Sequence, residues 1–221
     1  KSDQRRRFLR VAASSNPAMK YVFDTQLNLT WLADWNNAGP MNWYSAKDWA
    51  GAIRDFNGGW VLPAALDTGA PGFAEGWAYS GSDAGWNVYG SENARRATPL
   101  AHMFYDTLGN LSLADAMGNL QGGGGLKNTG PFRNMQFDRY WSGTLLDPLY
   151  GSMDIFGQGQ QAVWFDYLGG YQSSNWGVRE RLYAVAVRPG DVAAVPEGTS
   201  AGMVLLGLVA LIVAVRRRGI R

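Results

Sequence analysis

Apolar and polar residues alternate early in the chain, after a polar front segment. Residues 21–32 are rich in β-forming residues and carry a turn near Asp24, beyond which Leu27, Leu29 and Trp31 occupy every second position. A period of two residues is typical of a strand with one buried face. The pattern predicts a hairpin, or a pair of short strands, within residues 21–32.

The spacing of apolar residues then changes to three and four, which is the period of a helix with one apolar face. The first such segment runs from Trp43 to Phe56, with Asn42 or Ser45 as its N-terminal cap and Gly58-Gly59 as its end. A second helix is predicted from Thr98-Pro99 to Gly109, because a capping residue followed by proline is a typical helix start. The apolar face of this second helix is expected to contain Leu100, Met103, Phe104, Thr107 and Leu108.

Neither the histidine nor the glycine run that follows the second helix is predicted to have a catalytic or phosphate-binding role. His102, the sole histidine, lies about 200° around the second helix from Leu100, so we expect it on the exposed outer face and assign it no catalysis. The glycine run at 122–125 lacks the Lys-Ser/Thr pair of a phosphate-binding loop, and we interpret it as a flexible spacer.

The last third of the chain returns to strand-like segments. They cover residues 139–144 and 161–167; a Gly169-Gly170 turn then leads into Tyr171, and residues 183–190 close the sheet. Hairpin spacing makes these strands antiparallel. The fold class is therefore predicted to be α+β, with two helices and a small antiparallel sheet.

Residues 67–93 show no sustained period. Glycine recurs six times between aromatic residues, which predicts a long structured loop that can include short strands, and such loops often bind ligands. Aromatic rings beside acidic and amide groups could stack on sugar faces, although pinning the loop to the domain is their more common role. The candidate ligand contacts are Trp77, Tyr79, Asp83 and Trp86.

An uncharged apolar run, Ala201–Val215, precedes Arg216, Arg217 and Arg218 near the end of the chain. As a helix the run is about 22 Å long, shorter than the roughly 30 Å hydrocarbon layer. Starting at Gly198 and letting the arginines snorkel makes a thin span feasible. We therefore predict a C-terminal transmembrane helix with its arginines on the cytoplasmic side. A buried helix of a soluble protein is the alternative.

Charge is unevenly distributed over the 221 residues. The formal net charge is +2, yet between Tyr21 and Gly198 ten Lys or Arg stand against 17 Asp or Glu, a net of −7. An acidic body argues against nucleic acid as a partner. The lack of cysteine excludes disulfides, thiol catalysis and cysteine-based zinc sites. We expect no cofactor and no metal.

Residues 1–20 are interpreted as a basic linker after a removed leader, with a basic arm for anionic polymers as the alternative.

The tail resembles the PEP-CTERM sorting signal, in which a Pro-Glu motif, a transmembrane helix and an arginine cluster follow one another. Pro196 and Glu197 match the motif, whereas Gly198 stands where a second proline is usual. The resemblance implies a linker at 192–198 and a sorting signal at 199–221 that an exosortase processes. It also implies export, an inner-membrane anchor before processing, and a cell-surface or extracellular-matrix location afterwards.

Seven short motifs follow one another through the body, residues 21–191. They are, in order, Leu29-Thr30-Trp31-Leu32, Met41-Asn42-Trp43, Gly59-Trp60-Val61-Leu62-Pro63, residues 100–110, Gly130-Pro131-Phe132, residues 140–144 and residues 184–190. Through these motifs the body resembles the Lcl C-terminal-type domain, and its element order is similar to the C-type-lectin-like fold. The calcium motifs of sugar-binding lectins are absent.

The leading hypothesis is a non-enzymatic binding or adhesion module for extracellular polysaccharide or another surface component. One alternative is a secreted hydrolase that uses Asp83 with Glu75, or Asp154 with Asp166, as acid and base. The other is a purely structural component of a biofilm matrix. Deep burial of Trp77 and Trp86 would favour the structural alternative over sugar stacking.

Overall fold

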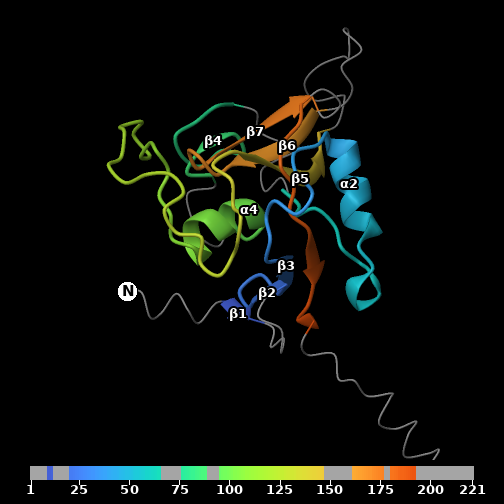
Figure 1. The fold of residues 1–221 in the computed structure, drawn as a ribbon. Helices are drawn as coiled ribbons and strands as arrows, with labels where there is room; N and C mark the ends of the chain where they lie inside the picture. The colour runs from blue at the N-terminus through green and yellow to red at the C-terminus, as the bar shows by residue number, and fades with distance from the viewer. Residues whose placement is uncertain are drawn as a thin grey trace, which may run out of the picture.

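In the part of the chain that the structure describes, the fold contains two antiparallel sheets and two α-helices (Figure 1). The structure, a computed structural model, describes residues 9–11, 20–65, 76–88, 95–146, 161–176 and 180–192. The first sheet has the order β1 (Leu9–Val11), β2 (Tyr21–Asp24), β3 (Leu29–Leu32), β8 (Val187–Pro189). The second has the order β4 (Gly85–Trp86), β7 (Tyr171–Trp176), β6 (Gln161–Asp166), β5 (Arg139–Leu145). The α+β class with antiparallel strands is confirmed.

The strands divide differently from the prediction of one sheet. Residues 183–190 do not simply close the sheet of β5 to β7, because β8 pairs with β3, with Trp31 opposite Val187. Just before β8, Tyr183 exchanges backbone hydrogen bonds with β5, at Arg139 and Trp141. This one segment therefore joins both sheets. Hairpin spacing predicts neighbouring pairs only, and the β3–β8 pair spans almost the whole domain.

The front of the chain also contributes to a sheet. Residues 9–11, which we assigned to a linker, form β1 and pair with β2, with Arg10 opposite Phe23. The linker interpretation is therefore wrong for these three residues. The hairpin β2–β3 is confirmed, and the carboxylate of Asp24 accepts hydrogen bonds from the N–H groups of Gln26 and Leu27 in its turn.

Helix α2 (Trp43–Ala52) begins and packs as predicted. The side chain of Asn42 is the cap and accepts a hydrogen bond from the N–H of Ser45. Trp43 is buried and its indole N–H donates to the carbonyl of Ser142 in β5. The helix ends early, however, and Phe56 lies in a short 3-10 turn (η1, Asp55–Asn57) with a left-handed backbone and an exposed ring. Phe56 is thus not part of the buried helix face.

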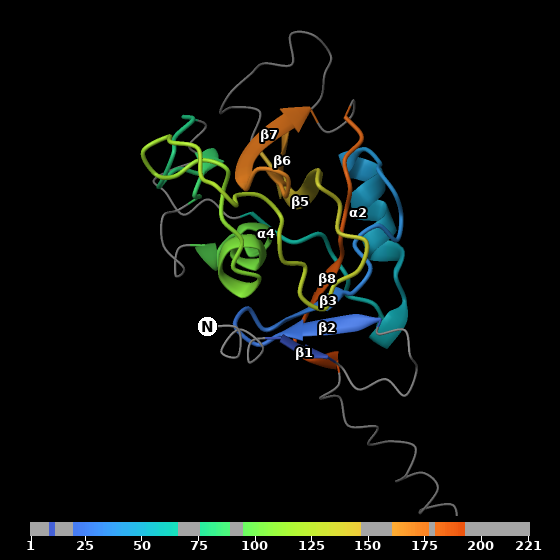
Figure 2. The same cartoon turned by 60° about the vertical axis from the view of Figure 1, so that its left-hand side comes forward.

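Helix α4 (Pro99–His102), with its π-helical continuation η2 (Met103–Thr107), lies between the two sheets (Figure 2). On one side Phe104 packs against Phe165 of β6, with 5.5 Å between the ring centroids. On the other side the hydroxyl of Thr107 donates to the carboxylate of Asp24 in β2 at 3.3 Å. The helix therefore has two buried sides, and all five residues of its predicted apolar face are buried.

His102 is fully buried, so its predicted exposure is wrong. Its Nδ1 lies 3.3 Å from the hydroxyl of Thr107, on the side that faces Asp24. The prediction assumed that a helix with one apolar face turns its other face to water. That assumption fails here because the hairpin of the first sheet covers the second side.

Gly124 and Gly125, the second half of the glycine run, are buried, so the interpretation as a flexible spacer is wrong for these two residues. The N–H of Gly125 donates to the carbonyl of Leu111 at 2.8 Å. A Cβ atom at Gly124 would lie 2.4 Å from the carbonyl oxygen of Ser112. These two glycines are required because backbone segments approach each other here more closely than a side chain allows.

The predicted transmembrane helix and sorting residues lie outside the described residues. These include Pro196, Glu197, Arg216, Arg217 and Arg218. Within the described ranges, no helix combines the length and apolar character needed to cross a bilayer.

Candidate binding site

One row of side chains crosses the second sheet from edge to edge. Trp86 of β4 is paired with Tyr171 of β7, Tyr171 with Asp166 of β6, and Asp166 with Arg139 of β5. Directly paired residues point to the same side of a sheet, so these four form one cross-strand row. The neighbouring Phe165 points to the opposite side and packs against η2. The cross-strand row therefore faces away from helix α4.

Four aromatic rings gather along this row. We call Trp77, Trp86, Tyr171 and Trp164 the aromatic cluster. Trp77 meets Trp86 edge to face at 6.1 Å and Tyr171 at 5.4 Å, and Tyr171 lies 5.4 Å from Trp164. Perpendicular contacts of this kind are the favoured geometry of aromatic pairs. The rings therefore hold one another in fixed orientations.

Trp77 stands at the open end of the cluster. Its residue is 52% exposed, whereas Trp164 at the other end is only 6% exposed. The next residue, Ala78, hydrogen-bonds to the edge strand: its carbonyl accepts from the N–H of Trp86 at 2.9 Å. A half-exposed tryptophan is thus held by ordered backbone and by two neighbouring rings.

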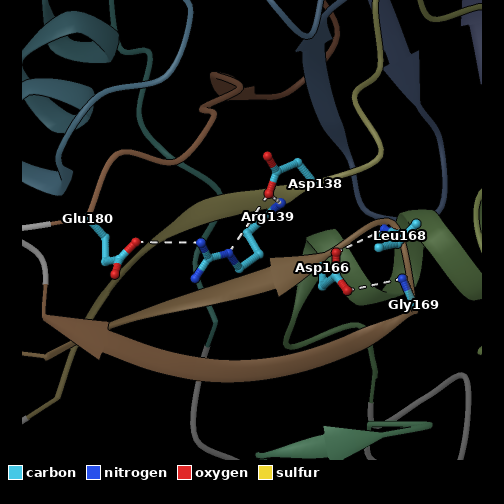
Figure 3. A network of polar contacts seen from close by, with 6 residues as sticks. All are labelled: Asp138, Arg139, Asp166, Leu168, Gly169 and Glu180. Atoms are coloured by element: carbon cyan, nitrogen blue, oxygen red, sulfur yellow. Dashed lines mark hydrogen bonds and ion pairs between the residues drawn. The ribbon is translucent and has the colours of Figure 1, made fainter.

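A carboxylate lies directly beside these rings. The side chain of Asp166 accepts hydrogen bonds from the N–H groups of Leu168 and Gly169, at 2.9 and 3.1 Å (Figure 3). A Cβ atom added to Gly169 would lie 2.9 Å from the ring of Trp86, 3.0 Å from the ring of Tyr171 and 3.1 Å from Asp166 Oδ2. Two rings and one carboxylate oxygen thus converge on a single glycine.

Burial changes the protonation of this carboxyl group. Asp166 is buried, and this raises its pKa above the usual value, while the two N–H donors act in the opposite direction. The nearby carboxylate of Asp138 adds to the rise and the guanidinium of Arg139 counters it. Asp166 therefore keeps its proton to a higher pH than an exposed aspartate does.

The other end of the cross-strand row carries a small ionic network (Figure 3). Arg139 lies 3.5 Å from Glu180 and 3.8 Å from Asp138, measured from guanidinium nitrogen to carboxylate oxygen. Its guanidinium also lies over the ring of Trp164, 5.3 Å from the centroid. The aromatic cluster thus already holds one cation against a ring face.

The structure brings together two of the four predicted ligand contacts. Trp77 and Trp86 belong to the aromatic cluster. Tyr79 is exposed, but its ring lies against Gly118 instead. Asp83 is 3% exposed, and its carbonyl accepts a hydrogen bond from the side chain of Gln172. A side chain so deeply buried does not offer an accessible contact, so the prediction for Asp83 is corrected.

Sequence reasoning missed the partners that β5, β6 and β7 supply. Tyr171, Asp166 and Arg139 were predicted to lie in strands, but not to share a row with Trp86. The sequence did indicate one of these neighbours, because the Gly169-Gly170 turn places Tyr171 opposite Asp166 in a hairpin. The pairing of Trp86 with Tyr171 had no local signal.

The hydrolase pairs are not assembled within the described residues. Glu75 and Asp154, one member of each pair, lie outside the described ranges. Among the side chains that the structure describes, no group of three or more His, Asp or Glu residues is arranged to hold a metal ion. Comparisons of the chain with protein-family models, curated proteins and solved structures gave no match.

Proposed function

We propose that this chain is an exported, non-enzymatic binding module that recognises extracellular polysaccharide through the aromatic cluster. The observation that supports this proposal most is the half-exposed ring of Trp77, fixed against Trp86 and Tyr171 beside the carboxylate of Asp166. Sugar rings have apolar C–H faces and polar hydroxyl edges. A site with aromatic walls and few polar groups suits both.

Rigidity supports the same proposal. Ordering a side chain on binding costs about 0.5–1.5 kcal/mol. The rings of Trp77 and Trp86 already restrain each other at 6.1 Å, so less of this cost remains to be met when a sugar binds. The exposure of Trp77 also disfavours the structural alternative, in which every tryptophan serves the core.

We further propose that the body is an Lcl C-terminal-type domain with a C-type-lectin-like fold, and that it binds without calcium. The two helices and the antiparallel strands are compatible with this finer assignment.

Replacing Trp77 with alanine is expected to weaken polysaccharide binding about tenfold, which corresponds to about 1.4 kcal/mol. The reason is loss of the exposed stacking face without loss of a core residue. The measurement is retention of the full chain on immobilised cellulose, chitin, chitosan and polygalacturonate, followed by titration with the polymer that is retained.

Tyr44→Ala is the matched control, because it removes another exposed aromatic ring, on α2. Helix α2 contacts β5, the strand at the opposite edge of the sheet from β4. Equal binding by Trp77→Ala and wild type would contradict the proposed site. Failure of the wild-type chain to bind any of the four polymers would contradict the function itself.

We propose that an exosortase recognises Pro196, Glu197 and the arginine cluster and releases the domain from the inner membrane to the cell surface or matrix. Mass spectrometry of the C-terminus, in cells with and without their exosortase, tests this step. Loss of residues 199–221 only when the exosortase is present is expected. An intact tail in the inner membrane of both strains would instead indicate a permanent anchor.

A further inference from the structure

We infer that the site selects glycans that carry amino groups over neutral and acidic glycans. This inference rests on the proposed function and adds the chemical class of the ligand. It follows from the charges along the cross-strand row and from the cation that the aromatic cluster already holds.

The charged rim of the aromatic cluster is acidic. Asp138 and Glu180 supply two carboxyl groups beside the one guanidinium of Arg139, and the carboxyl group of Asp166 lies further along the same row (Figure 3). The side chains of Asp138 and Glu180 are 52% and 41% exposed, against 31% for Arg139. Solvent and ligands thus meet more carboxylate than guanidinium at this end of the row.

The charged side chains lie close to the rings of the aromatic cluster. Asp138 and Glu180 place two carboxylates beside the one guanidinium of Arg139, which lies over Trp164 of the aromatic cluster. Asp166 adds a further negative charge only where it is ionised, because burial raises its pKa. An ammonium group in the same place is attracted both by this excess charge and by the faces of the rings.

Arg139 provides an internal example of that attraction. Its guanidinium lies 5.3 Å from the centroid of Trp164, within the range of cation–π contacts. Uronic acid carboxylates and sulfate groups would instead meet Asp138 and Glu180, which repel them. The net charge of −7 between Tyr21 and Gly198 acts in the same direction at long range.

The test compares three probes on the full chain: a glucosamine oligomer, an N-acetylglucosamine oligomer of equal length, and polygalacturonate. At mildly acidic pH, where the amines are protonated, the glucosamine oligomer is expected to bind about threefold or more tightly than its acetylated counterpart at about 20 mM salt. The difference should shrink at about 0.5 M salt, because exposed charges are screened.

The double variant Asp138→Asn, Glu180→Gln is expected to lose the preference, so that the glucosamine oligomer and the acetylated oligomer bind with equal affinity at low salt. Asp48→Asn, which removes an exposed carboxylate of α2 outside this network, should keep the preference. Trp77→Ala should weaken the binding of both oligomers.

Equal binding of the two oligomers at low salt would overturn the inference, as would tighter binding of polygalacturonate. If Trp77 is still needed for binding in those cases, the proposed function stands. If the wild-type chain retains none of the three probes, both the inference and the proposed function fall.

Discussion

Replacing Trp35 with alanine is expected to lower the free energy of unfolding by about 3–5 kcal/mol. Trp35 is completely buried and stacks on Trp31 at 5.5 Å. It also meets Phe132, Tyr140 and Tyr167 edge to face at 5.2–5.3 Å. These rings come from both sheets and the loop between them, so truncation leaves a cavity that neither sheet can fill alone.

The loss should arise from packing alone, since the indole N–H of Trp35 has no hydrogen-bond partner within the described residues. Urea unfolding followed by circular dichroism measures the change. Trp35→Phe keeps a ring in place and should lower the free energy of unfolding by less than half as much. This variant gives a measurable loss even if the alanine variant does not fold. A loss below about 1 kcal/mol for Trp35→Ala would show that the core closes over the cavity.

Replacing Gly85 with alanine is expected to destabilise the contact between β4 and the Ala78 segment by about 3 kcal/mol and to abolish the binding that depends on Trp77. The backbone of Gly85 has φ +119°, and an added Cβ would lie 1.9 Å from the carbonyl oxygen of Ala78. A positive φ costs an L-residue about 1–2 kcal/mol, and overpacking costs about 1–3 kcal/mol. The segment around Ala78 must therefore separate from β4, and Trp77 would lose its place beside Trp86.

Gly81→Ala is the matched control, because Gly81 also has a positive φ, +76°, but an added Cβ would meet nothing within 4 Å. Gly81→Ala should lower the free energy of unfolding by about 1 kcal/mol and leave the binding site intact. Hydrogen exchange distinguishes the two variants. In Gly85→Ala the amide of Trp86, which donates to Ala78, should exchange faster while β5 and β6 stay protected. Wild-type stability and binding in Gly85→Ala would contradict this account.

The aromatic cluster and the core differ in what holds them. Trp35 contacts four rings from both sheets and the loop between them, whereas the backbone beside Trp77 pairs with β4, an edge strand of two residues. Edge segments with few buried contacts open at lower free energy than a core. Loss of Trp35 should therefore be seen in global unfolding, and loss of Gly85 mainly in the site.

The elements with a strong local pattern were predictable. The period of three and four residues placed α2, and Asn42 was one of the two caps proposed for it. Alternation placed β2 and β3, and the strand content of β5 to β7 followed from β-forming residues between glycine turns. The end of α2 was missed because Phe56 continues the apolar spacing while its backbone turns left-handed.

The candidate site was predictable only in part. Trp77 and Trp86 stood out as aromatic residues among glycines, a local feature. Whether their rings or the carboxylate of Asp83 reached the surface depended on what covers them, and Asp83 proved to be buried. Tyr171 joined the site through its pairing with Trp86 of β4, a strand far away in the sequence, and Asp166 joined it through its pairing with Tyr171.

The sequence by itself determined the α+β class, the acidic body and the type of most local elements, since periodicity and composition depend on neighbouring residues. Only the tertiary structure decided that β8 pairs with β3, that His102 is buried between two sheets, and that the cross-strand row exists. These features depend on contacts between distant segments. Their free energy comes from packing and backbone pairing across the sheets, about which a local pattern carries no information.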